Sequence, residues 1–479
     1  MACEQLHAQA PHAVFLPCPT QGHVIPAIEF AETLASQGFI ITFVCAEHIT
    51  ARISKSHGSG LSPSIRLIGL PDEEQDIDQD ADIFITMVKI IENMVPAFEQ
   101  TVNGLFKNSK ESSVPPPLCI ISDFFLSWSQ DIAHKFNIPR YVFFPASSSC
   151  LAVMLYLPRF IEEGIAPVAA DVRDIVVPGL PPLDSYDLPS DWRQSVPQEW
   201  REYAFPSLLK IHESSGILVN TFNELEREAI DAVRTEAINP NKLPIYPLGP
   251  ILPSKFFRSE SIDQETLSET EKECLQWLDA QTPSSVLYIS FGSLAILSMR
   301  QIQELAKALD ACQQQAFLWI LRLPPSATAA TALPEGFLSR THSRGLIIST
   351  WAGQLLILSH PSTGGFLTHC GWNSTLESIC SGVPLLPLPQ FAEQFNNSRM
   401  VTEHWKVGLK LQRGPDDVAE SGEIEIGVRK LMQGHEGRAV RSRARELKEE
   451  AASAVAEFGS SHAALQAFIQ AAAASHTTT

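Results

Sequence analysis

Short apolar runs rich in β-branched and aromatic residues alternate with helical patterns along the first half of the chain. Such alternation is typical of βα repeats and predicts a parallel sheet covered by helices. Between the first two runs, the apolar spacing of residues 25–36 and the following Gly38 predict a helix that ends at a glycine. The strands predicted in this half cover residues 13–18, 40–45, 65–70, 118–122, 141–144 and 216–220.

The alternation resumes in the second half, beyond a stretch that mixes proline, serine and charged residues without a clear period. This stretch, residues 244–270, predicts a junction between two domains. The helices expected beyond it include residues 299–313, 372–380 and 392–404. The strands expected there cover residues 286–290, 317–321, 346–350, 365–369 and 383–388.

Two further segments depart from this alternation. Residues 167–197 are rich in proline and predict a long surface excursion, which in a compact domain is usually functional or mobile. Residues 424–473 are rich in alanine and carry mixed charges, which predicts a pair of helices docked on the surface.

The two alternating halves predict an α/β protein of two doubly wound, Rossmann-like domains that face each other across a cleft. The length of 479 residues agrees with this division, because a single core stops growing at about 250 to 300 residues. We place the first domain at residues 1–250 and the second at residues 251–460. We expect residues 461–479 to form a C-terminal helix or tail that packs back on the first domain. Ligands should bind in the cleft, at the carboxyl ends of the strands.

The charge balance narrows the range of partners. With 54 acidic and 35 basic side chains, the formal net charge is −19, which repels nucleic acid and anionic membrane surfaces. A phosphorylated ligand would therefore have to be bound locally, by backbone N–H groups at the start of a helix. We expect small-molecule ligands, no nucleic acid, no membrane insertion and a monomeric protein.

The cysteines and the N-terminus predict a cytoplasmic protein. The nine cysteines are scattered and mostly lie in apolar runs, as reduced core residues do. The first nineteen residues contain no Lys or Arg and only a short apolar core, unlike a secretory signal. No window reaches 18 consecutive apolar residues, the length expected of a membrane span.

Residues 351–394 contain the pattern with the clearest chemical meaning. A predicted strand is followed by Gly371 and by a predicted helix that opens with Trp372, Asn373 and Ser374. A turn of small residues that leads into a helix places unpaired N–H groups and polar side chains where a diphosphate can bind. Glu377 lies one turn into this helix and can reach sugar hydroxyls. The segment therefore predicts a nucleotide-sugar site.

This segment resembles the forty-four-residue signature box of the plant family 1 UDP-glycosyltransferases. The resemblance covers the whole chain and includes the amino-terminal PTQGHVIPAIEFAETLASQG and the mid-chain ILVNTFNELE. It implies a GT-B fold and an enzyme that uses a UDP-sugar as co-substrate, with no further cofactor.

The resemblance also implies roles for individual residues of the box. Trp351 would stack on uracil, and the backbone of Ala352 would pair with the edge of the base. Gln354 and Glu377 would hold the ribose hydroxyls. Contacts to the diphosphate are implied for Ser293, His369, Asn373 and Ser374, and contacts to the transferred sugar for Trp372, Glu393 and Gln394. A terminal glutamine combined with this tryptophan is usually associated with glucose in the family.

The candidate base is His23, which follows the first predicted strand at the end where doubly wound sheets display functional residues. Its unperturbed pKa of about 6.5 suits proton abstraction near neutrality. Asp123 follows another predicted strand and could fix the histidine tautomer and stabilise the imidazolium. Taken alone, such a histidine is more often structural and Asp123 could cap the next helix. The resemblance assigns both to catalysis and implies an inverting attack of an acceptor oxygen on C1 of an α-linked UDP-sugar, which gives a β-glycoside without a metal.

Apolar residues near Asp123 are candidates for the acceptor pocket. They favour a flat, apolar acceptor such as a phenolic. Each of them could equally fill the core of the first domain. These candidates are Phe124, Phe125, Trp128, Phe143, Phe144 and Met154.

Alternating aspartates in residues 76–82 could in principle bind a metal ion. The run has Ala81 and Met87 where a calcium loop needs glycine and glutamate, so we interpret it as a solvated acidic loop. The chain also lacks the dinucleotide-binding, Walker A, zinc-protease and nucleophile-elbow patterns. Two rival functions stay open on the sequence: another UDP-sugar enzyme of the same fold, such as an epimerase or a phosphorylase, and a UDP-sugar binder without turnover.

Overall fold

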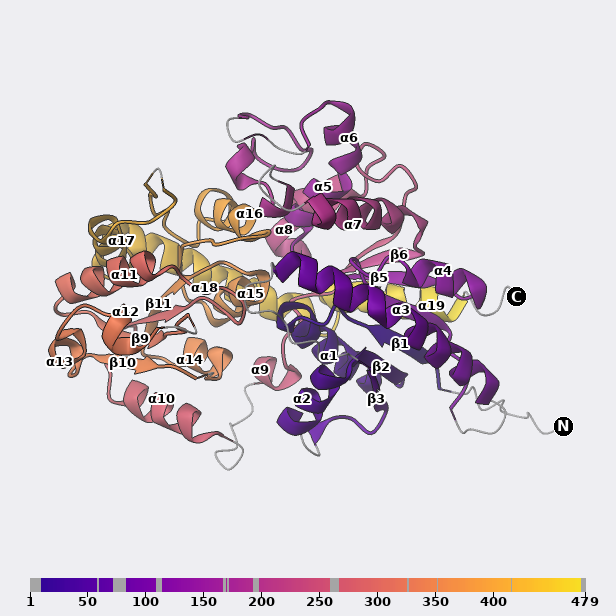
Figure 1. Cartoon of the computed structure of the whole chain (residues 1–479), viewed down its shortest axis with the longest axis horizontal. Coiled ribbons are helices and arrows are strands. Elements are labelled where there is room, and N and C mark those ends of the chain that lie inside the picture. Colours follow the sequence, from indigo (N-terminus) through magenta and orange to yellow (C-terminus); the bar gives the residue numbers. More distant parts are fainter. Residues whose placement is uncertain are drawn as a thin grey trace.

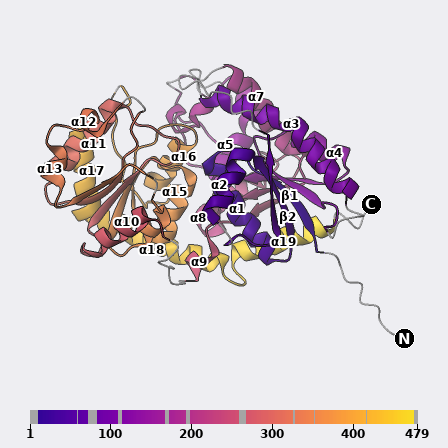
Figure 2. The ribbon, with the colours of Figure 1, turned by 60° about the horizontal axis from the view of Figure 1, so that its bottom comes forward.

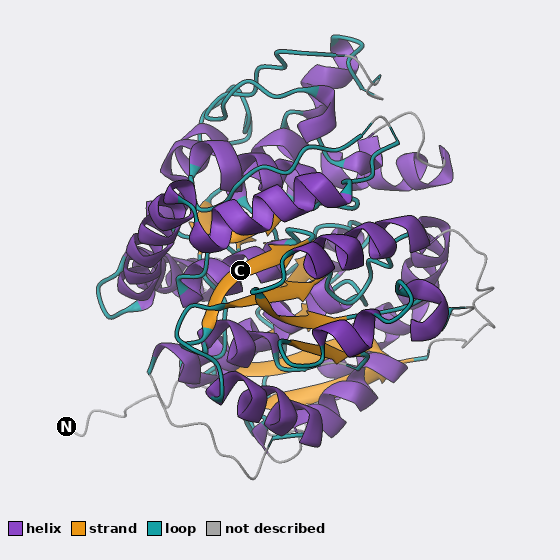
Figure 3. Ribbon diagram, turned by 90° about the vertical axis from the view of Figure 1, so that its left-hand side faces the viewer, coloured by secondary structure: helices purple, strands orange, loops and turns teal. Residues whose placement is uncertain are grey.

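Two parallel sheets, each with helices on both faces, form two lobes side by side in the computed structural model (Figure 1, Figure 3). The structure describes residues 10–57, 60–71, 83–108, 114–166, 169, 172–192, 198–258, 267–324, 327–350, 352–414 and 416–474. None of the helices given below combines the length and the hydropathy that a membrane span requires.

The first sheet has seven parallel strands in the order β3-β2-β1-β4-β5-β6-β7. Between β1 and β4 the direction of this order reverses, which makes that pair the switch point of the sheet. The strands are β1 (His12–Leu16), β2 (Ile40–Ala46), β3 (Ile65–Leu70), β4 (Cys119–Asp123), β5 (Arg140–Phe144), β6 (Gly216–Val219) and β7 (Ile245–Pro247).

Helices pack on both faces of this sheet, because successive residues of each strand point to opposite sides. Ile120 therefore belongs to one core layer, while the next residue, Ile121, belongs to the other. The helices are α1 (Gln21–Ser36), α2 (Glu47–His57), α3 (Ile83–Asn108), α4 (Ser129–Lys135), α5 (Ser148–Leu155), α6 (Leu157–Glu162), α7 (Gln198–Leu209) and α8 (Asn223–Val233), with short 3-10 turns at η2 (Ser185–Asp187), η3 (Ser190–Trp192) and η4 (Lys210–Glu213).

The second sheet has five parallel strands in the order β10-β9-β8-β11-β12, with its switch point between β8 and β11. The strands are β8 (Val286–Ser290), β9 (Ala316–Ile320), β10 (Gly345–Ile348), β11 (Thr363–Thr368) and β12 (Leu385–Pro387). The helices of this half are α9 (Ser254–Phe257), α10 (Glu269–Asp279), α11 (Met299–Ala311), α12 (Ala329–Ala332), α13 (Phe337–Thr341), α14 (Gln354–Ser359), α15 (Trp372–Ser381), α16 (Gln394–Arg399), the π-helical turn η6 (Met400–His404), α17 (Ser421–Gln433) and α18 (His435–Val455).

The last helix, α19 (Ser460–Ala474), returns to the first sheet (Figure 2). Its Phe468 is fully buried, with its ring centroid 5.0 Å from that of Tyr141 and 5.8 Å from that of Tyr246. Phe30 of α1 also packs against it, at 6.3 Å. The end of the chain thus completes the core of the first domain.

The predicted architecture of two doubly wound α/β domains is confirmed, and every predicted strand is present with ends shifted by at most two residues. All eight cysteines in the described part of the chain are buried and none forms a disulfide, as expected of reduced core residues.

One prediction about elements was wrong: the C-terminal tail holds three helices, α17 to α19, instead of two. The stretch predicted as a domain junction also contains β7, a three-residue strand that begins after Pro244 and ends at Pro247, so the prolines obscure its pattern. The helix predicted over residues 392–404 is present: α16 begins at Gln394, because Ala392 adopts a left-handed backbone with φ of 52°, and the π-helical turn η6 continues it to His404.

Candidate active site

The first switch point brings a histidine and an aspartate together. The register of β1 and β4 places Leu16 beside Ser122, so the residues that follow start from neighbouring positions. Asp123 is the last residue of β4. His23 lies in the first turn of α1, the helix that β1 leads into, and not at the strand end itself as the sequence suggested.

His23 and Asp123 form a hydrogen-bonded pair, with 2.6 Å between His23 Nδ1 and Asp123 Oδ2. Asp123 is completely buried, and its Oδ1 accepts a hydrogen bond from the backbone N–H of Phe125 at 3.1 Å. Because the carboxylate can only accept, the proton of the neutral imidazole belongs on Nδ1. Nε2 is left with a free lone pair, on a side chain that is 22% exposed and lines the cleft.

The surroundings of His23 strengthen it as a base. Burial disfavours its protonated form, but the charge of Asp123, the hydrogen bond to it and the charge of Glu393 outweigh burial and raise the pKa of His23 above 6.5. The rings of Phe124 and Phe125 lie beside the imidazole, with centroids at 6.0 and 5.8 Å. These rings restrict the imidazole to the orientation that the carboxylate selects.

A buried arginine, Arg140 of β5, supports the end of β4 from within the core. Its Nε donates to Ser122 Oγ at 2.7 Å and its Nη2 to the carbonyl of Asp123 at 3.2 Å. Burial lowers the pKa of Arg140 to about 10, against the opposing charge of Asp123, so the guanidinium remains charged at neutral pH. The buried carboxylate therefore has a cation behind it and a histidine in front, which offsets the cost of removing it from water.

The second switch point places His369 opposite the loop that follows β8. The register of β8 and β11 pairs Ser290 with Thr368. The ring of His369 lies between Gly292 and Gly371: a Cβ on either glycine would come within 2.7 Å of it. Gly292 also has a φ of 73°, so the close approach and the backbone both require glycine there. Burial lowers the pKa of His369 to about 4, which keeps the ring neutral and able to donate one N–H.

Helix α15 begins at this point with no side-chain cap on its N-cap residue, Gly371. Its free N–H groups and partial positive charge suit a diphosphate. Asn373 donates through Nδ2 to the carbonyl of Gly22 in the first domain at 2.9 Å. The indole of Trp372 is buried, with Nε1 donating to the carbonyl of Asn220 at 2.6 Å, so this side chain braces the domain contact and its N–H is not available to a sugar.

Gln354 and Glu377, both implied to hold the ribose, contact each other. Gln354 Nε2 donates to Glu377 Oε2 at 2.6 Å and to Ser374 Oγ at 2.8 Å, while its Oε1 accepts from Tyr288 at 3.3 Å. Burial raises the pKa of Glu377 to about 7, and the bond from Gln354 opposes this shift. The two side chains therefore present one fixed amide and one carboxyl group to the cleft, as the implied contact with a ribose requires.

Glu393 and Gln394 close the other end of the cleft. Gln394 Oε1 accepts from the backbone N–H groups of Gln390 at 2.9 Å and Phe391 at 3.2 Å, which folds the loop onto its own side chain. Burial raises the pKa of Glu393, opposed by its own backbone N–H, by the charge of His23 and by the backbone of Trp372. Both residues line the cleft, as the implied contact with a sugar requires.

A single cleft thus collects residues from both domains. The predicted site residues that line it are His23, Ser293, Gln354, His369, Trp372, Asn373, Ser374, Glu377, Glu393 and Gln394. Asp123 lies behind His23. Ala352 is buried in the core of the second domain and could act only through its backbone. Trp351 lies outside the described residues, as do Asp76, Asp78, Asp80 and Asp82.

The acceptor side of the cleft differs in part from the prediction. Phe124, Phe125 and Met154 line it, whereas Trp128, Phe143 and Phe144 do not. The last two are consecutive residues of β5, fully buried on opposite faces of the sheet, and Trp128 packs against Phe98 with centroids 5.5 Å apart. Several apolar residues that line the cleft were not predicted, because they come from separate segments and share no sequence pattern: Ile25, Met87, Cys150, Trp200 and Phe391.

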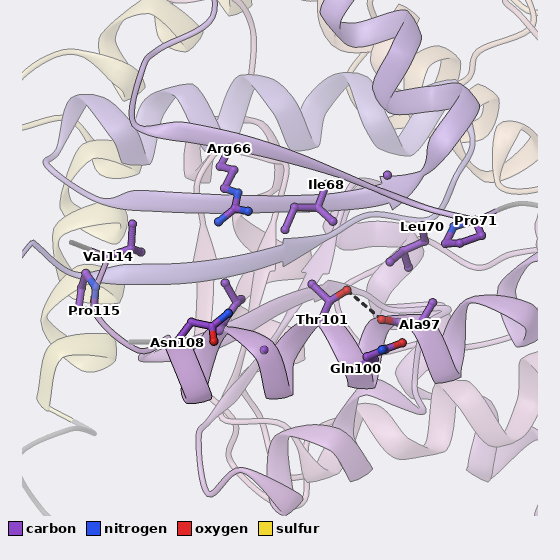
Figure 4. A pocket seen from close by; sticks show the side chains of 13 residues that line it. Arg66, Ile68, Leu70, Pro71, Ala97, Gln100, Thr101, Asn108, Val114 and Pro115 are labelled. Carbon is purple, nitrogen blue, oxygen red and sulfur yellow. Dashed lines mark hydrogen bonds between the residues drawn. The ribbon is translucent and has the colours of Figure 1, made fainter. Parts of the chain in front are cut away.

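A second cavity, of about 360 Å³, lies between β3 and α3 (Figure 4). Arg66, Ile68 and Leu70 face it from the strand, and Thr101 and Asn108 from the helix. None of the predicted site residues lines it.

Cys18 lies close to the His23–Asp123 pair, and within the described ranges these three are the one group arranged like metal ligands, with ligand atoms within 4.8 Å of one another. Burial and the charge of Asp123 raise the pKa of the Cys18 thiol well above its usual range, which disfavours the thiolate that a metal needs. The 2.6 Å contact between His23 and Asp123 is a hydrogen-bond distance and leaves no room for an ion between the two atoms.

Comparison with known proteins agrees with this geometry. A family model described as UDP-glucoronosyl and UDP-glucosyl transferase matches residues 205–414. UDP-glycosyltransferase 72B1 of Arabidopsis thaliana is 34% identical over 96% of this chain and 95% of the relative. The chain belongs to the plant family 1 UDP-glycosyltransferases.

Other members support the same assignment. Hydroquinone glucosyltransferase of Rauvolfia serpentina is 35% identical over 95% of this chain and 96% of its own length. The solved structure of Phytolacca americana UGT2 with UDP-2fluoro-glucose and pterostilbene matches with a TM-score of 0.83 and 32% identity, over 97% of this chain and 99% of that one. The fold of this UDP-glycosyltransferase is GT-B, and its activity is glycosyl transfer from a UDP-sugar.

The pH dependence of turnover tests the base. Because only neutral His23 can take a proton and its pKa is raised, kcat/KM should fall as pH drops through a value above 6.5. Asp123→Asn removes the carboxylate charge, so this acid limb should move to lower pH while kcat falls. His23→Ala should lower turnover by about 10²- to 10⁴-fold and abolish the limb, with UDP binding retained. Near-normal turnover of His23→Ala would disprove the assignment.

The glycine cage around His369 gives a second prediction. In Gly371→Ala the new Cβ would lie 2.6 Å from His369 Nε2, so the ring must move. We expect UDP affinity, measured by calorimetry, to fall by at least about tenfold, as when one charge-assisted hydrogen bond is lost. Gly422→Ala is the control, since a Cβ there meets nothing within 4 Å and the residue does not line the cleft. Equal affinities of the two variants would show that His369 does not touch the nucleotide.

The carboxyl group of Glu377 should make donor binding depend on pH. With a raised pKa of about 7, it is protonated below that pH and loses acceptor strength, so affinity for UDP-glucose should rise between pH 6 and pH 8. Glu377→Gln should bind more weakly, with an affinity that is flat over this range. UDP-glucose is the appropriate probe because its diphosphate does not titrate there. A pH-dependent affinity that persists in the variant would place the titrating group elsewhere.

Proposed function

We propose that this enzyme transfers glucose from UDP-glucose to a hydroxyl group of a small, apolar, phenolic acceptor, with inversion, to give a β-glucoside. The observation that carries the proposal is the position of the His23–Asp123 pair in the same cleft as the residues of the signature box. A base on one wall and donor-binding groups on the other allow an acceptor to meet C1 of the sugar from the side opposite the diphosphate.

The transfer is a single displacement. His23 Nε2 accepts the proton of the acceptor hydroxyl as its oxygen forms a bond to C1 of the glucose. The bond from C1 to the diphosphate oxygen breaks, and UDP leaves with that electron pair. The carboxylate of Asp123 stabilises the imidazolium that results, and the N-terminus of α15 with neutral His369 stabilises the charge on the departing diphosphate.

The apolar side chains on the acceptor side of the cleft favour an uncharged, aromatic substrate. The apolar side chains that line the cleft together with His23 include Met87, Phe124, Phe125, Met154 and Trp200. A charged acceptor would lose its hydration there without gaining a partner. The name of the Rauvolfia relative, a hydroquinone glucosyltransferase, and the pterostilbene bound to the Phytolacca structure point to the same class.

The proposal includes no metal and no further cofactor. It is supported by the direct hydrogen bond within the pair and by a diphosphate subsite made of backbone N–H groups and polar side chains. Turnover should therefore be the same after dialysis against EDTA as with added Mg²⁺. A loss of activity on chelation, restored by a divalent ion, would contradict this part of the proposal.

Mass spectrometry of reaction products tests the whole proposal. The enzyme is incubated with equal amounts of UDP-glucose, UDP-galactose and UDP-xylose and a panel of phenolic acids, flavonoids, terpenoids and hormones. We expect glucose adducts of phenolics that acid cleaves, as O-glucosides are cleaved. Conversion of the UDP-sugar without an acceptor adduct would favour an epimerase-like or phosphorylase-like enzyme. UDP-sugar binding without any product would favour a non-catalytic binder.

A further inference from the structure

A segment of the first domain reaches the second domain and contacts it beside the proposed sugar subsite. We call residues 183–192 the strap; they belong to the proline-rich excursion. The ring of Tyr186 packs on Phe395 with centroids 4.9 Å apart, and its hydroxyl donates to the carboxylate of Asp417. Asp187 lies 3.9 Å from the guanidinium of Arg399. The strap is thus joined to α16 and its surroundings at several points.

The contact nearest to the sugar subsite is a reciprocal pair of hydrogen bonds between Ser190 and Ala392. The backbone N–H of Ser190 donates to the carbonyl of Ala392 at 3.1 Å, and the backbone N–H of Ala392 donates to Ser190 Oγ at 2.6 Å. Both polar groups of the Ala392 backbone are therefore engaged by one residue of the other domain.

Ala392 needs such support because its φ is 52°, a left-handed conformation that a residue with a Cβ rarely adopts. Glu393 and Gln394 follow directly, and the direction in which the chain leaves Ala392 decides where their side chains lie. Gln394 Oε1 already accepts hydrogen bonds from the backbone N–H groups of Gln390 and Phe391, so contacts within the second domain hold the loop as well. Of the contacts described here that hold this loop, those made by Ser190 come from the first domain.

We propose that Ser190 is a positioning residue that sets the selectivity for the donor sugar by holding Ala392 in the left-handed conformation. The inference rests on the proposed function, in which Glu393 and Gln394 contact the transferred sugar. A loop held at Ala392 presents these two groups in one arrangement, which suits the hydroxyl pattern of one hexose. Without Ser190 Oγ, the N–H of Ala392 loses its acceptor and the loop can relax to commoner backbone conformations.

The test compares kcat/KM for UDP-glucose and UDP-galactose, epimers that differ at one hydroxyl. Ser190→Ala should raise the KM for the preferred donor by about fivefold to tenfold, the effect of one lost hydrogen bond, and lower the ratio of the two kcat/KM values by a similar factor. Affinity for UDP, which has no sugar, should change by less than about twofold. Ser190→Thr keeps the hydroxyl and should keep the ratio.

A second substitution tests the route through the backbone. Glycine adopts positive φ readily, so Ala392→Gly introduced into Ser190→Ala should recover most of the lost selectivity. Tyr186→Phe is the matched control: it breaks another contact of the strap, to Asp417, and should lower the melting temperature without altering the donor ratio.

The outcomes separate the inference from the proposed function. If the wild-type enzyme transfers no hexose, the proposed function fails. If it transfers one but Ser190→Ala keeps the wild-type KM and donor ratio, the inference fails. It also fails if Ser190→Ala weakens UDP and UDP-glucose binding equally, because the effect would then not involve the sugar. A parallel loss of ratio in Tyr186→Phe would show that the strap acts only by holding the domains together.

Discussion

The hydrogen bond between His23 and Asp123 depends on the adjacency of β1 and β4. These strands are separated in the chain by two further strands and three helices, yet they are neighbours in the sheet because the strand order reverses between them. The two strands stay paired as far as Leu16 and Ser122, and the connections that follow them part at this switch point, where α1 starts and His23 meets the strand end of Asp123. The N–H of Phe125 holds the carboxylate of Asp123, and Arg140 holds the backbone carbonyl of the same residue from within the core. If the strand order were different, the same residues would not form a base.

The acidic composition of the protein disfavours binding of an anionic donor, and the donor half of the cleft has features that offset this repulsion. A protein with a net charge of −19 must bind a dianionic diphosphate, yet no Lys or Arg belongs to the described residues that line the cleft. In the proposed function, the positive end of α15, the neutral ring of His369 and the amide of Asn373 would take the place of a cationic clamp. Such a site would hold UDP by dipoles and geometry, and product release would not require a fixed ion pair to separate.

The features that could be predicted from the sequence are those that a local apolar pattern or a motif encodes. Strands such as Ile65–Leu70 and Val286–Ser290 were located to the residue, because their apolar runs end at clear breaks. The pairing of His23 with Asp123 came from the resemblance. Phe143 and Phe144 could not be distinguished from pocket residues, since a strand buried on both faces gives the same aromatic signal as a ligand wall. Trp200 lies far along the chain from His23, and no local period relates the two.

Contacts between the domains were also invisible to sequence patterns, although the donor site depends on them. Asn373 is held by the carbonyl of Gly22, the indole of Trp372 by the carbonyl of Asn220, and Ala392 by Ser190. In each case a residue next to the donor groups is braced by the first domain, and in the first two the acceptor is a backbone carbonyl, which any residue type would supply. A pattern of side chains in the sequence therefore cannot indicate which residues supply these backbone acceptors. The consequence is that the signature box does not hold its geometry alone, because contacts from the first domain brace Trp372, Asn373 and Ala392.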